Sequence, residues 1–372
     1  MVYALFIWTR LAANGYDLSA FVWAGDVYVN PALVPPSLHV QRDYIGYDGQ
    51  FFYRLALDPF TSRAADFGIT LDLPAYRQQR IVYPLIVWAL SLGGRPALVP
   101  SLMIAVNFAA LCAIGWLAGS YARSLRRNAL WGILVALYPG FFWSLSLDLS
   151  EILECCLILS GLLLLQRGKH LAAALALTLA VLTKEPALLV VVGVVIAGVL
   201  LEWRTETRRH GWRVLLIPVV VYLLGQLFLF HVWGQVPVLA GNHNLGLPLQ
   251  GLSGAVVQFL TEKIGTYVSQ VVLVLAFSIA VAFSLGATRA VQGVRLSWVL
   301  YGSLAVLLTG DVWNYDVSFL RALSEWYVLG ALIVIGSKER PRRTMLAGMV
   351  AIWLVIVLRH ITTTYFGPLY HP

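Results

Sequence analysis

The chain has 372 residues, of which 59% are hydrophobic and 12% are charged, and its mean hydropathy is +0.78. A soluble domain carries about 25% charged residues, so the composition excludes a soluble enzyme, a disordered chain and a collagen-like fibre. Apolar runs of about 20 residues instead predict a polytopic helical membrane protein, because a helix satisfies its own backbone hydrogen bonds in lipid. The net charge of +8 is concentrated in short loops, which favours a role in membrane topology over nucleic-acid binding.

The apolar runs predict an all-α bundle with about eleven transmembrane helices. If the N-terminus is cytoplasmic, every even-numbered span ends at a basic cluster, as the positive-inside rule requires. Most acidic residues lie in the predicted external loops or within the spans, since only Glu202, Glu206 and Glu339 fall in the predicted cytoplasmic loops. Chemistry on the external side explains this bias, although Asp and Glu contribute little to topology and also tolerate translocation. The predicted spans are residues 1–24, 97–120, 129–147, 150–165, 171–184, 186–201, 213–231, 268–287, 296–310, 318–336 and 344–360.

Residues 25–95 form the longest stretch without a spanning pattern, and a loop this long is usually functional. Within it, residues 81–94 are too few to cross a bilayer. With Tyr83 and Trp88 as interface anchors, they predict a helix lying on the outer leaflet. We expect a single domain over residues 1–372, with the first external loop at 25–95 and helices two to eleven at 97–360.

The densest polar cluster in that loop is RDYIGYDGQFFYRLALDPF, residues 42–60. Asp48 precedes a predicted helix at residues 50–57, and capping that helix is one interpretation of its carboxylate. The other is a general base at the membrane surface, beside an aromatic platform for a sugar or lipid headgroup. Asp58 is a weaker candidate base, because an Asp before Pro is typical of a helix end. Candidate substrate contacts here are Asp43, which is also a candidate base, Tyr47, Gln50 and Tyr53.

A second acidic cluster, LDLSEILEC, lies at the predicted external end of spans three and four. Asp148 ends the third span, while Glu151 and Glu154 lie three apart on one face at the start of the fourth. Carboxylates at that depth are costly and usually face a wet cavity, so Asp148 and Glu151 are candidate substrate contacts. Capping by Ser150 with Glu154 in the first turn is the alternative.

Two further external turns offer basic candidates. Lys184 and Glu185 either form an interfacial ion pair or contact an anionic substrate, in which the ammonium binds phosphate. Arg321 and Glu325 lie four apart and either neutralise one another or leave the guanidinium for a lipid-linked phosphate. Arg80 in the first loop is a third candidate cation.

His243 is a candidate contact in the Gly- and Asn-rich segment GNHNLGLPLQG. The spacing of His, Cys and carboxylate residues predicts no metal cage. P-loop, G-x-G-x-x-G and G-x-S-x-G elements are also missing from the sequence, which argues against nucleotide-driven transport.

These segments together resemble the GT-C superfamily of integral membrane glycosyltransferases. GYDGQFFYRLALDP resembles the first-loop motif of a bacterial branch associated with cell-surface glycopolymers. RIVYPLIVWALSLGGRPALVPS and LTKEPALL are similar to segments of the lipid A aminoarabinose and mannosyl transferases. PGFFWSLSLDLSEILE looks like part of the mannosyltransferases that build GPI anchors. The resemblance covers roughly residues 16–190 and rests on topology and the external segment from Asp311 to Arg321 beyond them.

The resemblance implies an inverting transfer of a sugar from a polyprenyl-phosphate donor to a glycan, lipid or protein acceptor, on the external face of a bacterial inner membrane. Asp48 would act as general base, and Lys184, Arg321 or Arg80 would stabilise the leaving phosphate. Many family members show adjacent acids in this loop, whereas Asp43 and Asp48 are five apart. The identity of the base and any need for a divalent cation, Mg or Mn, therefore stay open, and no nucleic acid is an expected partner.

Two other functions remain alternatives. A flippase for lipid-linked sugars also needs cavity-facing acids and cations, but we find none of the internal repeats typical of transporters. An O-antigen polymerase or ligase also has a large external loop, which in those enzymes typically comes late in the chain, whereas here the largest loop comes early.

Overall fold

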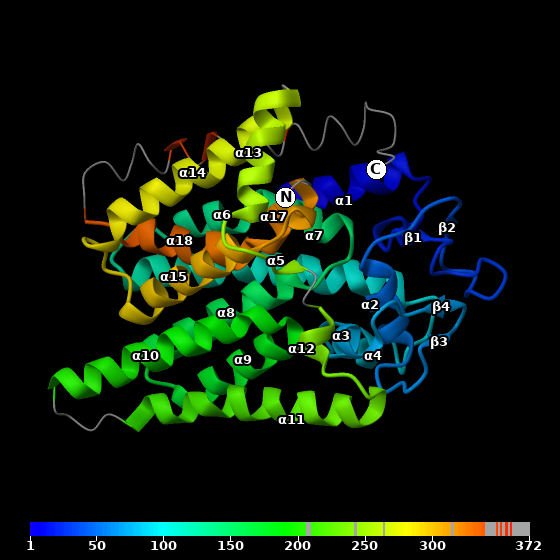
Figure 1. Ribbon diagram of the computed structural model, residues 1–372, viewed down its shortest axis with the longest axis horizontal. Helices are drawn as coiled ribbons and strands as arrows, with labels where there is room; N and C mark the ends of the chain where they lie inside the picture. Colours follow the sequence, from blue (N-terminus) through cyan, green and yellow to red (C-terminus); the bar gives the residue numbers. More distant parts are fainter. Residues whose placement is uncertain are drawn as a thin grey trace.

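The computed structural model describes residues 1–205, 210–241, 244–262, 265–313 and 316–338, with short pieces between 347 and 358. Within these residues the chain is mostly helical, and most of its long helices run along the long axis of the molecule (Figure 1). Four strands of two residues each supplement the predicted all-α architecture. The helices are α1 (Val2–Ala13), α2 (Gly49–Leu57), α3 (Pro74–Gln78), α4 (Val82–Leu90), α5 (Val99–Ser124), α6 (Trp131–Ala136), α7 (Pro139–Ser146), α8 (Glu151–Gln166), α9 (His170–Thr183), α10 (Leu188–Thr205), α11 (Leu216–Trp233), α12 (Pro237–Ala240), α13 (Gln250–Glu262), α14 (Gly265–Leu285), α15 (Gln292–Leu307), α16 (Gly310–Trp313), α17 (Asp316–Ala322) and α18 (Ser324–Gly336).

Three helices among the described residues are long and apolar enough to cross a membrane, namely Val99–Ser124, Glu185–Arg204 and Gly211–Trp233. The chain is therefore an integral membrane protein. The predicted count of about eleven spans is not reached by this measure, because several other apolar helices, such as α1 and α9, are shorter. The eleventh predicted span, 344–360, lies mostly outside the described residues.

Three predicted spans are broken rather than continuous. The first, predicted at 1–24, is α-helical only as far as Ala13, and a turn and a short 3₁₀ helix at Leu18–Phe21 follow it. The span predicted at 129–147 divides into α6 and α7, and the second of these helices begins at Pro139. Proline has no backbone N–H to donate within a helix, but it suits the first helical turn. The span predicted at 318–336 likewise divides into α17 and α18 around Leu323.

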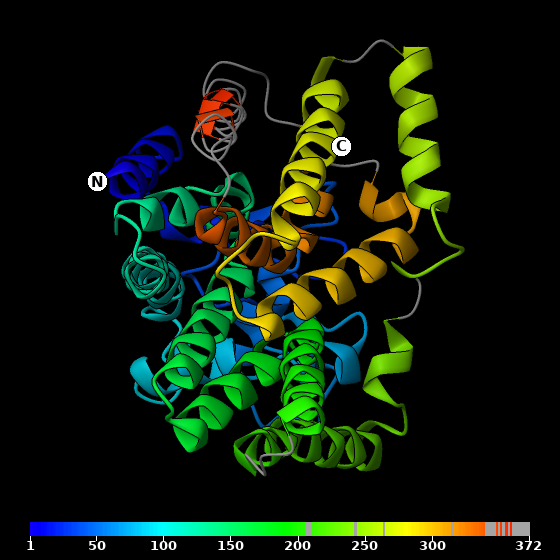
Figure 2. The same cartoon turned by 90° about the vertical axis from the view of Figure 1, so that its left-hand side faces the viewer.

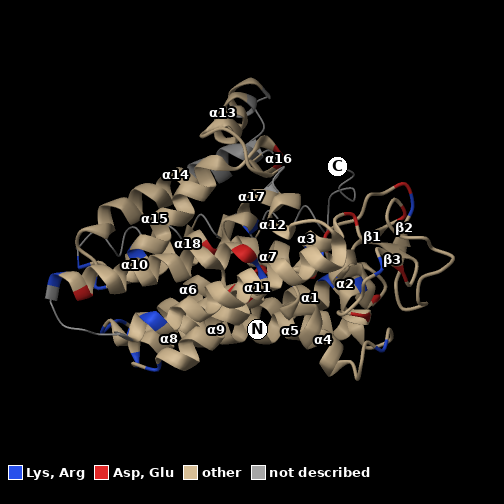
Figure 3. Ribbon diagram, turned by 60° about the horizontal axis from the view of Figure 1, so that its bottom comes forward, with Lys and Arg blue, Asp and Glu red and all other residues tan. Residues whose placement is uncertain are grey.

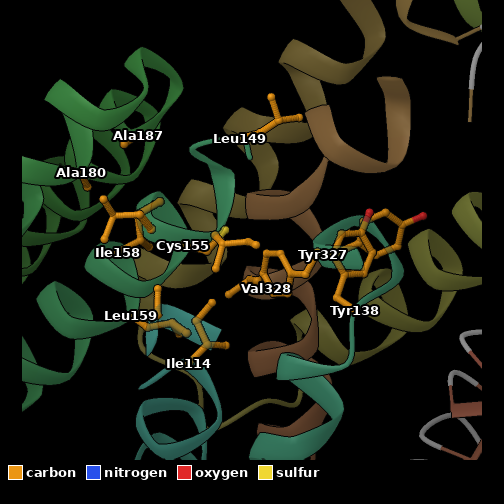
Figure 4. Packing of buried hydrophobic residues seen from close by; sticks show 14 of the residues in the cluster. Ile114, Tyr138, Leu149, Cys155, Ile158, Leu159, Ala180, Ala187, Tyr327 and Val328 are labelled. Carbon is orange, nitrogen blue, oxygen red and sulfur yellow. The ribbon is translucent and has the colours of Figure 1, made fainter. Parts of the chain in front are cut away.

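Helix α18 lies at the centre of the bundle. Every residue from Ser324 to Gly336 is buried, as expected for a helix that is apolar on all faces beyond its first turn. Figure 4 shows Tyr327 and Val328 of α18 packed near Ile114 of α5 and Cys155 of α8. The core thus joins helices that are far apart in the sequence.

Loops that the charge pattern assigns to the cytoplasm meet at one end of the bundle. Arg127 donates a hydrogen bond of 2.7 Å to the carbonyl of Ser337, and Arg289 donates one of 3.2 Å to the carbonyl of Leu125. Basic residues gather at this end in Figure 3. Which side of the membrane this end faces remains a prediction.

The long first loop packs at the other end of the bundle. It contains a parallel pair, β1 (Ala24–Gly25) with β2 (Val40–Gln41), and an antiparallel pair, β3 (Ala65–Asp66) with β4 (Ile69–Thr70). Helix α2 was predicted to within one residue, and it ends at Asp58 as expected. Helix α4, with nine residues, is too short to span a bilayer.

Helix α2 is pressed directly against the bundle at Gly49. A Cβ atom at this position would lie 2.3 Å from the carbonyl oxygen of Leu147 and 2.7 Å from that of Val22. Only glycine permits such a close backbone approach. The contact brings the start of the first-loop helix next to the start of α8.

Candidate active site

A cavity of about 510 Å³ lies between the first loop and the bundle. Residues from α3, α8, α11 and α17, together with Asp48 directly before α2 and the turn between α9 and α10, contribute to its wall. Leucines form an apolar part of the lining, and ionisable side chains form a polar part. Such a division suits a ligand that is charged at one end and hydrophobic at the other. Its charged lining residues are Asp48, Asp72, Arg77, Arg80, Glu151, Lys184, Glu185, Asp311 and Arg321.

Asp48 faces this cavity instead of capping its helix. Its backbone is helical and its side chain makes no capping hydrogen bond, so the capping interpretation is wrong. One carboxylate oxygen, Oδ1, lies 2.9 Å from Nη1 of Arg77, and the other, Oδ2, lies 3.4 Å from Nη1 of Arg321. The carboxylate is therefore held between two guanidinium groups.

Arg77 of α3 is fixed by a second carboxylate. Its Nε and Nη2 donate hydrogen bonds of 2.8 and 2.7 Å to the two oxygens of Asp72. The guanidinium also lies 4.4 Å from the centre of the Phe51 ring. This two-pronged pairing and the cation–π contact fix the orientation of the group that holds Asp48.

Arg321 joins three parts of the chain. Its Nη1 donates to Glu151 Oε1 at 2.9 Å and contacts Asp48, and its Nη2 donates to the Tyr47 hydroxyl at 3.2 Å. The alternative in which Arg321 pairs with Glu325 is wrong. Because the helix breaks between α17 and α18, the four-residue spacing does not place the two side chains together.

Lys184 lies among three buried carboxylates. Its Nζ is 3.1 Å from Glu325 Oε1, 3.5 Å from Glu151 Oε1 and 3.8 Å from Glu154 Oε2. The predicted alternative of a local pair with Glu185 is therefore wrong.

The predicted capping of α8 by Ser150 is also wrong, since the Ser150 side chain makes no capping hydrogen bond.

Glu185 instead pairs with Arg80 across 105 residues of sequence. Nε and Nη2 of Arg80 donate to the two carboxylate oxygens at 2.9 and 2.6 Å. The Arg80 guanidinium also lies 4.4 Å from the centre of the Tyr76 ring. The first loop is thus tied to the turn between α9 and α10 at the cavity wall.

The surroundings of Asp48 hold its carboxyl in the ionised form. Burial by itself would raise the pKa of Asp48, but the positive charges of Arg77, Arg321 and Arg80 outweigh it and lower this pKa to about 2. Burial would lower the pKa of Arg77, yet the carboxylates of Asp48 and Asp72 raise it above its usual value. Both groups are charged at neutral pH.

Four predicted substrate contacts lie away from this cavity. Asp43 is exposed, and the Gln50 side chain accepts from the Gly25 N–H and donates to the Ile45 carbonyl. The buried Tyr53 hydroxyl lies 3.3 Å from that of Ser37. Asp148 is fully buried, and its carboxylate oxygens have no hydrogen-bond partner among the described residues.

The predicted aromatic platform is mostly buried as well. Phe51 and Phe52 are 3% and 2% exposed, and only Tyr47 of this group is half-buried and contacts Arg321. His243 lies outside the described residues. Of the predicted site residues, the structure brings together Asp48, Tyr47, Arg80, Glu151, Lys184, Glu185 and Arg321.

Arg77, Asp72 and Glu325 also belong to this cluster, although the sequence does not predict them as site residues. Arg77 lies on the short helix α3, whereas Arg80 lies beyond its end, so no shared helix face signals that both line the cavity. Nothing in the local sequence indicates that Glu325 contacts Lys184, because 141 residues separate them. Among the described residues, no group of three or more His, Cys, Asp or Glu side chains is arranged to hold a metal ion.

No family model and no curated protein matches the sequence. Two solved structures are similar over 99% of this chain. One is ArnT from Cupriavidus metallidurans bound to undecaprenyl phosphate, at 14% identity and a TM-score of 0.51, of which 66% is covered. The other is ArnT from the same organism in the apo state, at 15% identity and a TM-score of 0.48, of which 65% is covered.

This chain therefore spans slightly less than two thirds of the length of the ArnT chains that it matches. The similarity to the undecaprenyl-phosphate complex extends along the whole bundle and the first loop, although few residues are identical. The chain thus shares the fold of ArnT.

Proposed function

We propose that the protein is a membrane glycosyltransferase that moves a sugar from a polyprenyl-phosphate donor to an acceptor hydroxyl. The observation that carries this proposal is the charged end of the main cavity, where the Asp48 carboxylate lies among the cationic groups of Arg77, Arg80 and Arg321, with Lys184 nearby. The ArnT structure with the same fold is bound to undecaprenyl phosphate. The apolar lining of the cavity suits the start of such a lipid chain.

The proposed reaction is a single displacement with inversion at the anomeric carbon. The acceptor oxygen forms a bond to this carbon, and the bond from the carbon to the phosphate oxygen breaks with its electron pair. Asp48 takes the proton of the acceptor hydroxyl. Arg321, Arg80 and Lys184 stabilise the extra negative charge on the departing polyprenyl phosphate, because cations already fixed in place need no reorganisation as that charge develops.

Donor binding also adjusts Asp48 for this task. A carboxylate with a pKa of about 2 is ionised but weakly basic. The negative charge of the donor phosphate would compete for the same guanidinium groups and so raise the pKa of Asp48. The base would thus become stronger once the donor is in place.

We further propose that the cavity opens on the external side of a bacterial inner membrane. The basic loops at the opposite end of the bundle support this orientation through the positive-inside rule. The acceptor, whether glycan, lipid or protein, would then approach from outside the cell.

The decisive experiment reconstitutes the full chain in liposomes with candidate polyprenyl-phosphate sugars and candidate glycan, lipid or protein acceptors, and measures release of polyprenyl phosphate. Asp48→Asn should abolish release, because the amide cannot accept the proton, while donor binding persists. Asp43→Asn is the matched control, since this carboxylate is exposed and lies five residues away. It should retain activity.

Near wild-type release by Asp48→Asn would overturn the assignment of the base. Sugar movement across the bilayer without release of polyprenyl phosphate would identify a flippase instead.

A further inference from the structure

A second cavity, of about 470 Å³, lies on the first loop and shares no lining residue with the first. Its wall is formed by the end of α1, the short 3₁₀ helix η1 (Leu18–Phe21) and the pair β1–β2. Figure 1 shows β1 and β2 at the loop end of the molecule, beyond the long helices. None of the residues that carry the proposed transfer reaches this cavity.

The lining combines two aromatic rings with planar polar groups. The rings of Trp23 and Tyr44 lie 6.2 Å apart at an angle of 39°. Among the described lining residues only Ala20 and Ala24 have aliphatic side chains. The polar lining residues are Asn14, Asp17, Ser19, His39, Gln41 and Arg42.

This combination matches the chemistry of a sugar ring. A pyranose has C–H groups that pack on an aromatic face, and hydroxyls that both donate and accept hydrogen bonds. Trp and Tyr offer an apolar face together with a polar edge. Carboxylate, amide, imidazole and guanidinium groups supply the paired acceptors and donors for neighbouring hydroxyls.

The walls of the cavity are held in place before any ligand binds. Asp17 Oδ1 accepts from the backbone N–H and the hydroxyl of Ser19, both at 2.8 Å, and the Ser19 hydroxyl oxygen accepts from the His39 N–H at 2.9 Å. The carboxylate of Asp26 accepts from the N–H groups of Asp43 and Tyr44 at 3.0 and 3.1 Å. Such preorganisation lowers the entropic cost of binding.

Trp23 itself is held in an unusual conformation. Its φ of 53° lies in the left-handed region, which is unfavourable for a bulky side chain. The Arg10 guanidinium lies 5.1 Å from the centre of the Trp23 ring. The carbonyl of Trp23 accepts a hydrogen bond of 3.0 Å from the Tyr47 N–H. Strain of this kind persists where the surroundings enforce it, and it is common at ligand-binding positions.

We propose that this second cavity binds a pyranose unit of a glycan acceptor. The inference that a sugar ring binds here depends only on the cavity. The inference that the bound glycan is the acceptor rests on the proposed glycosyl transfer. Tyr44 and Asp48 are four residues apart, so their Cα atoms are separated by at most about 14 Å. Tyr47, between them, contacts Arg321 of the first cavity. A short oligosaccharide anchored on Trp23 and Tyr44 would thus extend toward Asp48.

The test measures binding of the full chain in lipid nanodiscs to an array of defined oligosaccharides of hexoses, hexosamines and uronic acids. The wild type should bind at least one of them. Tyr44→Ala should weaken this binding about tenfold, which corresponds to about 1.4 kcal/mol, while Tyr44→Phe should largely preserve it. The double variant His39→Ala/Arg42→Ala, at two exposed residues, should also lose affinity.

Arg95→Ala is the matched control, because Arg95 is exposed and lies outside both cavities. It should bind as the wild type does. The absence of any bound oligosaccharide on the wild type would overturn the proposal, and so would unchanged binding by both Tyr44→Ala and His39→Ala/Arg42→Ala.

The two proposals can fail separately. Asp48→Asn should still bind the oligosaccharide, since it leaves the second cavity intact. Binding that depends on Tyr44, without any release of polyprenyl phosphate by the wild type, would contradict only the proposed transfer. Release without Tyr44-dependent binding would contradict only the second cavity.

Discussion

At the scale of single residues, Asp48 shows how a carboxylate is diverted from a structural role. It stands at the start of α2, where an Asp usually caps the helix, but its side chain turns toward Arg77 and Arg321. The first-loop carboxylates Asp43 and Asp58 lack this environment. The proposed base is thus distinguished by its cationic neighbours more than by its position in the sequence.

Arg77 should control the pH dependence of the reaction. Because Arg77 lowers the pKa of Asp48, Arg77→Gln removes a positive charge that favours the ionised carboxylate, and this pKa should rise. The acid limb of kcat/KM, which reports the free enzyme, should therefore move to higher pH. The measurement is the pH profile of polyprenyl phosphate release by the variant and the wild type.

An acid limb that stays in place or moves to lower pH would contradict this prediction. Arg95→Ala serves as the control for loss of an arginine elsewhere on the first loop, and its profile should match that of the wild type.

At the scale of elements, the close contact between α2 and the bundle determines where Asp48 lies. Gly49 allows the backbone of α2 to touch the carbonyl groups of Leu147 and Val22. Since Asp48 is the preceding residue, any shift of this helix moves the carboxylate relative to Glu151 and Arg321. The glycine therefore positions the site although it carries no functional group.

Gly49→Ala should destabilise the protein by about 1–3 kcal/mol, because the added methyl group clashes with backbone atoms that have little room to move. The measurement is the unfolding midpoint in detergent together with polyprenyl phosphate release, and both should fall. Gly225→Ala in α11 is the matched control.

A Cβ at Gly225 would meet no atom within 4 Å. This control should be neutral or slightly stabilising, since alanine favours a helix over glycine. Equal unfolding midpoints for Gly49→Ala and the wild type would show that α2 does not depend on this close approach.

The bounds of several helices can be predicted from the local sequence. Apolar runs and caps predicted α2, α5 and α10 within a few residues, because hydrophobic length and helix signals are local properties. The breaks around Tyr138 and Leu323 were missed. A run of apolar residues looks the same whether the helix is continuous or interrupted.

At the scale of the whole molecule, Lys184 joins elements from distant parts of the chain. It follows α9 and contacts Glu151 and Glu154 of α8 and Glu325 of α18. Glu151 is a candidate from sequence because carboxylates at membrane depth usually face a wet cavity, and Lys184 is one because an ammonium at an external turn suits phosphate. The pairing with Glu325 depends on how the helices pack, which no local pattern encodes.

Lys184→Met should destabilise the fold by about 3–5 kcal/mol, because it leaves buried carboxylates without their cation. The measurement is unfolding in a denaturing detergent. Lys169→Met, at an exposed loop position, is the control and should change little. Adding Glu325→Gln to Lys184→Met should recover part of the loss, and a double variant no more stable than Lys184→Met would contradict the pairing.

The ionic cluster around the first cavity also has a consequence for selectivity. Among the described residues, the ion pairs of this cluster join six carboxylates to four cations, Arg77, Arg80, Lys184 and Arg321. Each basic group already has an internal counter-ion, so a small soluble anion gains little by displacing one. A lipid-anchored phosphate arrives with the additional free energy of its hydrocarbon chain and with a high local concentration in the bilayer. The surplus of acids would thus act as a filter that disfavours inorganic phosphate and nucleotides and admits membrane-borne substrates.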